Sequence, residues 1–297
     1  MARITLLDGG MGQELLARTG DAPTPLWATQ VMIDHPDLVR DIHADYFAAG
    51  ATVATTNTYA IHHDRLIRAG KDHLFVTLLR KAAAQAVAAR GAQGGRVAGS
   101  LGPLVASYRP DLCPPVGEAA AKYAEIVRIL APHVDLFLCE TMASVMQVEG
   151  ALEGASAAEL PVWISVTVDD RDGSRLRSGE AVADLAGIFA RRRPAAVLAN
   201  CAVPEAMAAA LTELARFGLP YGAYANGLTH ISEAFLQDAP TVDTLTARHD
   251  LTPDRYAAFA MDWVAQGATI VGGCCEVGPA HIAALAKALR AGGHDIA

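Results

Sequence analysis

The chain has 297 residues, of which 52% are hydrophobic and 19% are charged, a composition typical of a packed globular protein. Its net charge of −8 argues against a nucleic-acid partner, which would normally bind a basic face. The first residues lack the apolar region of a secretory signal, and no apolar run is long enough to span a membrane, so we expect a cytoplasmic protein.

Short β-rich runs alternate with alanine-rich helical stretches along the whole chain. They recur about every 37 residues, the length of one strand, one helix and two loops. This spacing predicts an α/β fold, a single (β/α)8 TIM barrel that occupies residues 1–297 as one domain. In chain order, the expected strands are 4–8, 52–56, 97–100, 136–140, 162–168, 196–200, 222–225 and 268–272.

The stretches 64–90, 118–132 and 253–266 have the pattern of amphipathic helices. Pro253 follows Thr252, which places a proline in the first turn behind a good N-cap. The segment 227–252 is irregular and long for a connection, so it is either a lid or substrate loop or an ordinary surface excursion.

Polar residues gather where the expected strands end. The active site of such a barrel lies at the C-terminal ends of its strands, so these residues are the candidates for chemistry. They are Asp8, Thr55, Thr56, Asn57, Ser100, Glu140, Asn200, Cys201, Asn226, Cys274 and Cys275.

Three of these residues are cysteines with a spacing that favours a metal site. Cys201 ends the sixth strand, and Cys274 and Cys275 follow the eighth. Strands six and eight lie roughly 10 Å apart, a gap that two cysteine side chains can span with Zn–S bonds of about 2.3 Å. Soft sulfur ligands favour zinc, and three thiolates leave the fourth position open, as in a catalytic site. Cys113 and Cys139 have no partner at metal spacing, and we expect them to be structural.

Two simpler interpretations of these cysteines remain open. Cys274 and Cys275 could be buried core thiols or a strained vicinal disulfide, and Cys201 could be a small core residue. A barrel hydrolase that binds metal through histidines is disfavoured, because no His-x-His pair ends a strand and the side chains of His62 and His63 point apart in an extended chain.

Six segments, in this order and over nearly the whole chain, resemble the homocysteine S-methyltransferase family. The Gly-Gly-Cys-Cys element with an upstream Asn-Cys is the most specific of them. The segments are Asp8-Gly9-Gly10-Met11-Gly12-Gln13-Glu14-Leu15, Thr56-Asn57-Thr58-Tyr59, Gly99-Ser100-Leu101-Gly102-Pro103, Glu140-Thr141-Met142, Asn200-Cys201 and Gly272-Gly273-Cys274-Cys275.

The resemblance implies Zn²⁺ bound by Cys201, Cys274 and Cys275, with the thiol of homocysteine as the fourth ligand. It also implies that Asp8 and Glu140 hold the amino group of the substrate, which agrees with the preference of an ammonium for paired carboxylates. Two structural roles compete with this assignment. Asp8 could cap the following helix, and Glu140 could form a buried ion pair with another strand end.

The backbone amides around Gly10 and Met11 are implied to receive the substrate carboxylate, as exposed N–H groups of a glycine-rich turn can. Tyr59, Asn200 and Asn226 are candidates for the pocket wall, or are local hydrogen-bonding groups at strand ends. The implied reaction is zinc-dependent methyl transfer from a small onium donor to the thiol of L-homocysteine, forming methionine.

The donor is left open by two departures from the family pattern, Glu276-Val277-Gly278 after the double cysteine and Tyr224-Ala225-Asn226 without an intervening proline. S-methylmethionine is favoured, because the barrel leaves no residues for folate- or cobalamin-binding modules; betaine and S-adenosylmethionine are alternatives. Aromatic residues that could surround a cationic donor are Trp27, Tyr59, Tyr108 and Trp163.

Two rival functions remain. One is a component that takes the methyl group from a separate corrinoid protein. The other is a non-catalytic zinc- or thiol-binding barrel. The expected partners are small-molecule substrates only, with no nucleic acid and no membrane, and we expect a monomer or a small homo-oligomer.

Overall fold

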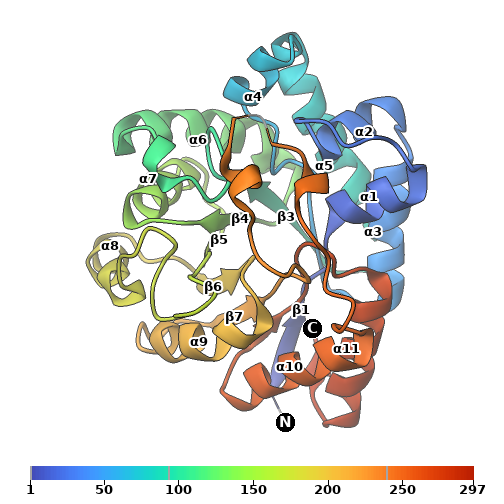
Figure 1. The fold of residues 1–297 in the computed structure, drawn as a ribbon, viewed down its shortest axis with the longest axis vertical. Helices are drawn as coiled ribbons and strands as arrows, with labels where there is room; N and C mark the ends of the chain where they lie inside the picture. Colours follow the sequence, from blue (N-terminus) through green and yellow to red (C-terminus); the bar gives the residue numbers. More distant parts are fainter. Residues whose placement is uncertain (1, 93, 239) are drawn as a thin grey trace.

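The strands form one parallel sheet that curls into a barrel, with helices around it (Figure 1). The computed structural model describes residues 2–92, 94–238 and 240–297. The expected (β/α)8 barrel is confirmed, and the eight expected strands are present with shifts of one or two residues at most of their ends. The strands are β1 (Arg3–Leu6), β2 (Val53–Thr55), β3 (Arg96–Leu101), β4 (Leu136–Met142), β5 (Val162–Val166), β6 (Ala196–Asn200), β7 (Tyr221–Tyr224), β8 (Ile270–Val271) and β9 (Asp295–Ile296).

The barrel is closed between its first two strands. β1 pairs with β8 on one side. On the other side, Leu7 forms a parallel bridge with Val53, and the Asp8 amide donates to the Val53 carbonyl at 3.0 Å. The two-residue strand β9 pairs with β1 outside this ring. Sequence reasoning did not predict it, because a pair of extended residues has no periodicity to detect.

The helices run along the outside of the sheet and cover its apolar face. One expected helix, 64–90, is wrong as a single element: it is broken after Arg68, where Gly70 adopts a left-handed φ of 66°. The helices are α1 (Met11–Thr19), α2 (Ala28–Asp34), α3 (Leu38–Ala49), α4 (His63–Arg68), α5 (Phe75–Arg90), α6 (Val116–Leu130), α7 (Val145–Ala155), α8 (Ala186–Arg191), α9 (Met207–Ala215), α10 (Pro253–Ala265) and α11 (Pro279–Ala291).

The expected N-cap of α10 is confirmed. The Thr252 side chain accepts a hydrogen bond from the Arg255 amide at 3.3 Å, and Pro253 occupies the first turn. Within the residues that the structure describes, no helix combines the length and the apolar character needed to cross a membrane.

The interior of the barrel is a second, smaller core. Trp163 fills it at the N-terminal ends of the strands, where the Arg96 guanidinium lies 5.2 Å from its ring centroid. Trp163 is therefore removed from the candidates for a cation cage, because it lies at the end of the barrel opposite to the cysteines. The pocket with the candidate site residues opens at the C-terminal ends of the strands.

Candidate metal centre and substrate pocket

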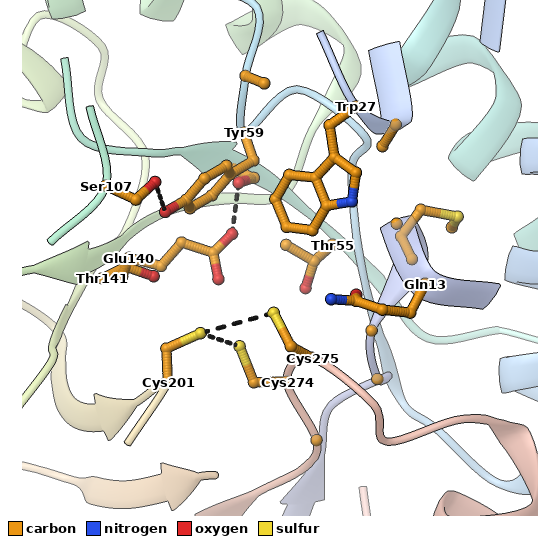
Figure 2. Close-up of a pocket in the computed structure, with 18 of the residues that line it drawn as sticks. Gln13, Trp27, Thr55, Tyr59, Ser107, Glu140, Thr141, Cys201, Cys274 and Cys275 are labelled. Atoms are coloured by element: carbon orange, nitrogen blue, oxygen red, sulfur yellow. Dashed lines mark hydrogen bonds between the residues drawn. The ribbon is translucent and has the colours of Figure 1, made fainter. Parts of the chain in front are cut away.

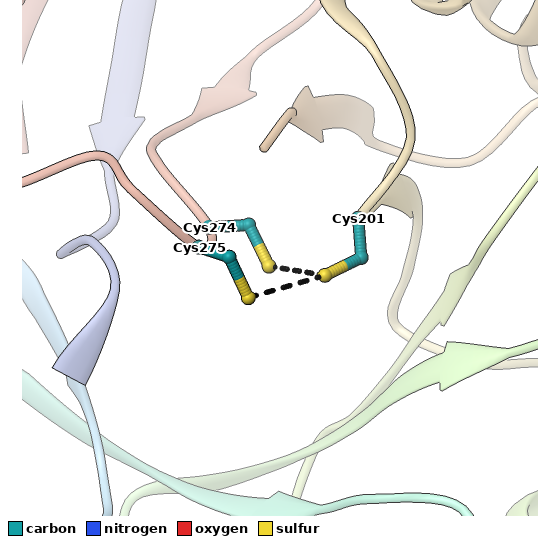
Figure 3. Close-up of side chains that lie close together, drawn as sticks. All are labelled: Cys201, Cys274 and Cys275. Atoms are coloured by element: carbon teal, nitrogen blue, oxygen red, sulfur yellow. Dashed lines mark hydrogen bonds between the residues drawn. The ribbon is translucent and has the colours of Figure 1, made fainter. Parts of the chain in front are cut away.

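Two segments that are remote in the chain bring three thiols together at the C-terminal end of the barrel (Figure 3). The Sγ atom of Cys201 lies 2.7 Å from that of Cys274 and 3.8 Å from that of Cys275. Cys201 directly follows β6, and the other two follow β8 across two glycines. The parallel strands bring both segments to one edge of the sheet, so the three thiols form one cluster that could hold a metal ion.

The separations suit a thiolate-bound metal ion better than a disulfide. Two sulfurs on a tetrahedral ion with bonds of about 2.3 Å lie about 3.8 Å apart. The Sγ atoms of Cys201 and Cys275 have this separation. The distance between the Sγ atoms of Cys201 and Cys274 would have to increase by about 1 Å when a metal ion binds. All five cysteines of the chain are free, so the vicinal disulfide is absent. Cys113 and Cys139 lie outside the cluster, as expected.

The three thiols share charge unequally. Hydrogen bonds with Cys274 and Cys275 hold the pKa of Cys201 well below its ordinary value. Hydrogen bonding to Cys201 in turn raises the pKa of Cys274 and that of Cys275, with burial adding to the effect. In the metal-free protein the cluster therefore favours one thiolate, and release of the other protons is coupled to binding of a cation.

Asp8 is buried beside this cluster and is held by β2. Its carboxylate accepts hydrogen bonds from the Thr55 amide at 2.7 Å and from the Thr55 hydroxyl at 2.8 Å. It does not cap α1, whose N-terminus has no side-chain cap. Burial raises the pKa of Asp8 from 3.8 to about 7, against the lowering effect of the Thr55 hydrogen bonds.

Glu140 lies near the end of the fully buried strand β4 and faces the same pocket (Figure 2). Its carboxylate accepts hydrogen bonds from the Ser100 hydroxyl and, at 3.2 Å, from the Tyr224 hydroxyl. Burial raises the pKa of Glu140 to about 7, and the Ser100 hydrogen bond partly opposes this shift. It forms no ion pair with a described residue, so the alternative of a structural ion pair fails.

The two carboxylates lack a permanent cationic partner among the described residues. The nearest basic group is His43, whose Nδ1 lies 3.9 Å from Asp8 Oδ2. Burial lowers the pKa of His43 to about 3, so the imidazole is neutral and its contact with Asp8 is not an ion pair. Two buried acids without a neutralising base form a site that an ammonium group fits.

The glycine turn before α1 lies directly against the cysteines. A Cβ atom at Gly10 would lie 2.7 Å from the Cys274 carbonyl oxygen, so only glycine fits this approach. The Gly10 amide already donates to the Val277 carbonyl at 2.9 Å. The first backbone amide available to a ligand at the N-terminus of the nine-residue helix α1 is therefore that of Met11. Met11 lines the pocket, and its amide can donate to an anion.

Aromatic residues form the outer wall of the pocket. Trp27 and Tyr59 meet edge to face at 6.1 Å, and Tyr108 meets Phe235 in the same way at 6.0 Å. The pocket has a cavity volume of about 100 Å³. Phe235 belongs to the segment 227–252, so this segment supplies part of the wall.

Sequence reasoning missed Gln13 and Ser107 as pocket residues. Gln13 Oε1 and Trp27 Nε1 are buried without a hydrogen-bond partner, a condition typical of groups that await a ligand. Ser107 bonds the Tyr59 hydroxyl at 2.7 Å and fixes this ring (Figure 2). The position of Gln13 in the glycine-rich segment after β1 could have indicated that it lines the pocket. No feature of the sequence indicates this for Ser107.

Asn200 and Asn226 are not among the residues that line the pocket, which favours the alternative of local hydrogen-bonding groups at strand ends. Asn200 accepts from the Thr141 amide at 2.9 Å and from the Ser165 hydroxyl at 2.8 Å, which occupies its oxygen. Asn226 accepts from the Leu228 amide at 3.1 Å. Both side chains hold strand ends in place, while Tyr59 does line the pocket as expected.

Residues with strained backbone cluster around the same pocket. Trp27, Tyr108, Thr141, Cys201 and Glu276 have φ between 50° and 63°, a region that non-glycine residues seldom occupy. Such conformations persist where the surrounding structure fixes them, and they are frequent at functional sites.

Comparison with known proteins agrees with this geometry. The family model described as Homocysteine S-methyltransferase matches residues 5–289. The Homocysteine S-methyltransferase of Escherichia coli is 32% identical over 95% of this chain and 94% of that protein. Homocysteine S-methyltransferase 4 of Zea mays is 27% identical over 98% of this chain and 90% of that protein.

Solved structures give the same result. The metallated form of the Escherichia coli homocysteine methyltransferase MmuM superposes with a TM-score of 0.79 at 29% identity, over 96% of both chains. That protein was solved with metal, and the cluster of Cys201, Cys274 and Cys275 fits a metal ion in this chain. On its sequence, its fold and its thiol cluster, the chain belongs to the homocysteine S-methyltransferase family of enzymes.

Proposed function

We propose that the protein transfers a methyl group from a small onium donor, with S-methylmethionine favoured, to the thiol of L-homocysteine and forms methionine. One observation carries this proposal: three converging thiols and two buried, unneutralised carboxylates line a single pocket. The metal is assigned as Zn²⁺ on Cys201, Cys274 and Cys275, because an all-sulfur set of three ligands favours zinc with an open fourth position.

Bound zinc would supply a Lewis acid that lowers the pKa of the incoming thiol, which is about 8.5 when free. The residues of the chain orient the substrate. Asp8 and Glu140 bind its ammonium, and the Met11 amide at the start of α1 binds its carboxylate. With both ends fixed, the substrate thiol points to the cysteine cluster, and this positioning lowers the entropic part of the barrier.

The aromatic wall accepts the donor. Trp27, Tyr59 and Tyr108 present rings that attract a cation and exclude water. The substrate sulfur attacks the methyl carbon, the bond from carbon to the onium atom breaks, and its electron pair stays on the donor, which leaves as a neutral thioether or amine. This step cancels charge, so a dry site favours it over water.

The test is a zinc analysis combined with a methionine assay that offers S-methylmethionine, betaine and S-adenosylmethionine in parallel. We expect one zinc per chain, and we expect Cys274→Ser to lose both metal and activity. Cys113→Ser, outside the cluster, is the matched control and keeps both. A Cys274→Ser variant that retains zinc and activity would refute the assignment.

The same assay separates the rival functions. Turnover only with a methylcobalamin protein would identify a corrinoid-dependent component. Bound zinc without methionine from any donor would favour the non-catalytic barrel.

A further inference from the structure

A second cavity opens beside the substrate pocket and shares the side chains of Trp27, Ser107 and Phe235 with it. Its volume is about 670 Å³, and we call it the vestibule. Its walls come from the segment 24–30, α4, the loop after β3 and the segment 227–252. The last of these crosses the barrel face near α4 in orange (Figure 1). A ligand too long for the inner pocket extends into this space.

Three arginines line the vestibule, and two of them are neutralised. Arg68 forms an ion pair with Asp238. Arg109 donates from Nε and Nη2 to the two carboxylate oxygens of Asp111, at 2.8 and 2.6 Å. Arg65 forms no ion pair with a described residue, so it carries an uncompensated positive charge at this cavity.

The guanidinium of Arg65 is half-buried and has spare donor capacity. One hydrogen bond, from Nη2 to the Pro103 carbonyl at 3.2 Å, is described for the five N–H groups of this side chain. Its Nε is buried without a partner. The adjacent carboxylate of Asp64 does not pair with the Arg65 guanidinium. This carboxylate accepts hydrogen bonds from the backbone amides of Arg65, at 2.7 Å, and Val105, at 2.6 Å.

Tyr59 connects this cation to the inner pocket. Its ring lines the pocket that holds the thiols, and the Arg65 guanidinium carbon lies 5.9 Å from the ring centroid. Along the path through Trp27, Ser107 and Phe235, a ligand first meets the aromatic wall and then the fixed positive charge. The arrangement suits a zwitterion whose cationic end lies in the inner pocket and whose anionic end lies in the vestibule.

We infer that Arg65 determines donor specificity by binding the carboxylate of the onium methyl donor in the vestibule. This inference rests on the proposed methyl transfer. A guanidinium binds a carboxylate through charge-assisted hydrogen bonds, which are stronger than neutral ones. A donor with three or four bonds between the onium atom and the carboxylate carbon spans roughly 4–5 Å, whereas the two bonds of betaine span about 2.5 Å, so the carboxylate of the longer donor extends further from the inner pocket toward the vestibule.

The test uses two sulfonium ions that differ in the carboxylate alone. Dimethylsulfoniopropionate carries it, and dimethyl(propyl)sulfonium has a methyl group in its place. Their affinities for the zinc-loaded enzyme are measured by calorimetry without homocysteine, so that no methyl transfer occurs. The proteins are the wild type, Arg65→Met, Arg65→Lys and a control, Arg80→Met, on the exposed face of α5.

We expect the wild type and Arg80→Met to bind the carboxylate-bearing ion about 10- to 100-fold more tightly than its partner, the range expected for a charge-assisted hydrogen bond. Arg65→Met loses this preference and keeps its affinity for dimethyl(propyl)sulfonium, and Arg65→Lys retains part of the preference. Equal loss for both ions would reveal a structural role through Pro103 and overturn the inference, as would an unchanged preference or no binding of either ion.

A methionine assay on the same proteins separates this inference from the proposed function. If the preference for the carboxylate-bearing ion depends on Arg65 and no methionine forms, the carboxylate site at Arg65 is supported and the methyl transfer is refuted. If methionine forms and Arg65→Met shows the wild-type preference, the methyl transfer is supported and the carboxylate site at Arg65 is refuted.

Discussion

Asp8 makes the folded, ligand-free protein less stable when it is ionised. Burial raises its pKa from 3.8 to about 7, a shift of about three units, and each unit corresponds to about 1.36 kcal/mol. Below pH 3.8 the carboxyl is protonated in both the folded and the unfolded chain, and it carries no such penalty. The penalty grows as the pH rises and is complete above pH 7, where it reaches about 4 kcal/mol.

Asp8→Asn removes this charge and keeps the shape of the side chain. The asparagine oxygen still accepts from the Thr55 amide, so the local geometry is retained. We expect the free energy of unfolding of the metal-free protein to rise, by about 4 kcal/mol at pH 8.5 and by about 2 kcal/mol at pH 5.5, where the ionised form is already disfavoured in the fold. The same change removes one partner of the substrate ammonium, so homocysteine binding weakens.

The assay is urea denaturation of both proteins at the two pH values, with calorimetry of homocysteine binding at pH 8.5. Asp262→Asn, at an exposed position of α10, is the matched control and changes neither quantity appreciably. Destabilisation by Asp8→Asn at pH 8.5, or a stability gain of the same size at both pH values, would refute the reasoning that burial of this charge is costly.

Three further predictions concern neighbouring residues. The kcat/KM for homocysteine rises with pH through about 7, because the acids must ionise to bind the ammonium, and Glu140→Gln lowers it about 100-fold in pH-resolved kinetics. Gly10→Ala places a Cβ against the Cys274 carbonyl, so it lowers zinc content and costs about 1–3 kcal/mol in denaturation experiments. Asn200→Ala leaves the Thr141 amide and the Ser165 hydroxyl unpaired, and thermal unfolding reports a loss of about 2–4 kcal/mol. Wild-type behaviour of any variant contradicts its prediction.

Local sequence signals predicted the barrel well because each strand is a short apolar run with polar residues after it. β6 begins and ends at the predicted residues, 196 and 200. The break between α4 and α5 was missed, because Gly70 interrupts a stretch whose composition is otherwise helical. The pairing of β9 with β1 depends on contacts between the two ends of the chain, which no local pattern encodes.

By itself, the sequence determined the fold class and the convergence of Cys201 with Cys274, because parallel strands bring their C-terminal ends to one edge whatever the loops do. Only the tertiary structure decided which polar groups face the pocket. The Asn200 side chain hydrogen-bonds with Thr141 and Ser165, whereas the Glu140 carboxylate faces the pocket without a neutralising base. The direction of a side chain at a strand end depends on the backbone angles of the turn and on competing hydrogen bonds, and both arise from residues distant in the chain.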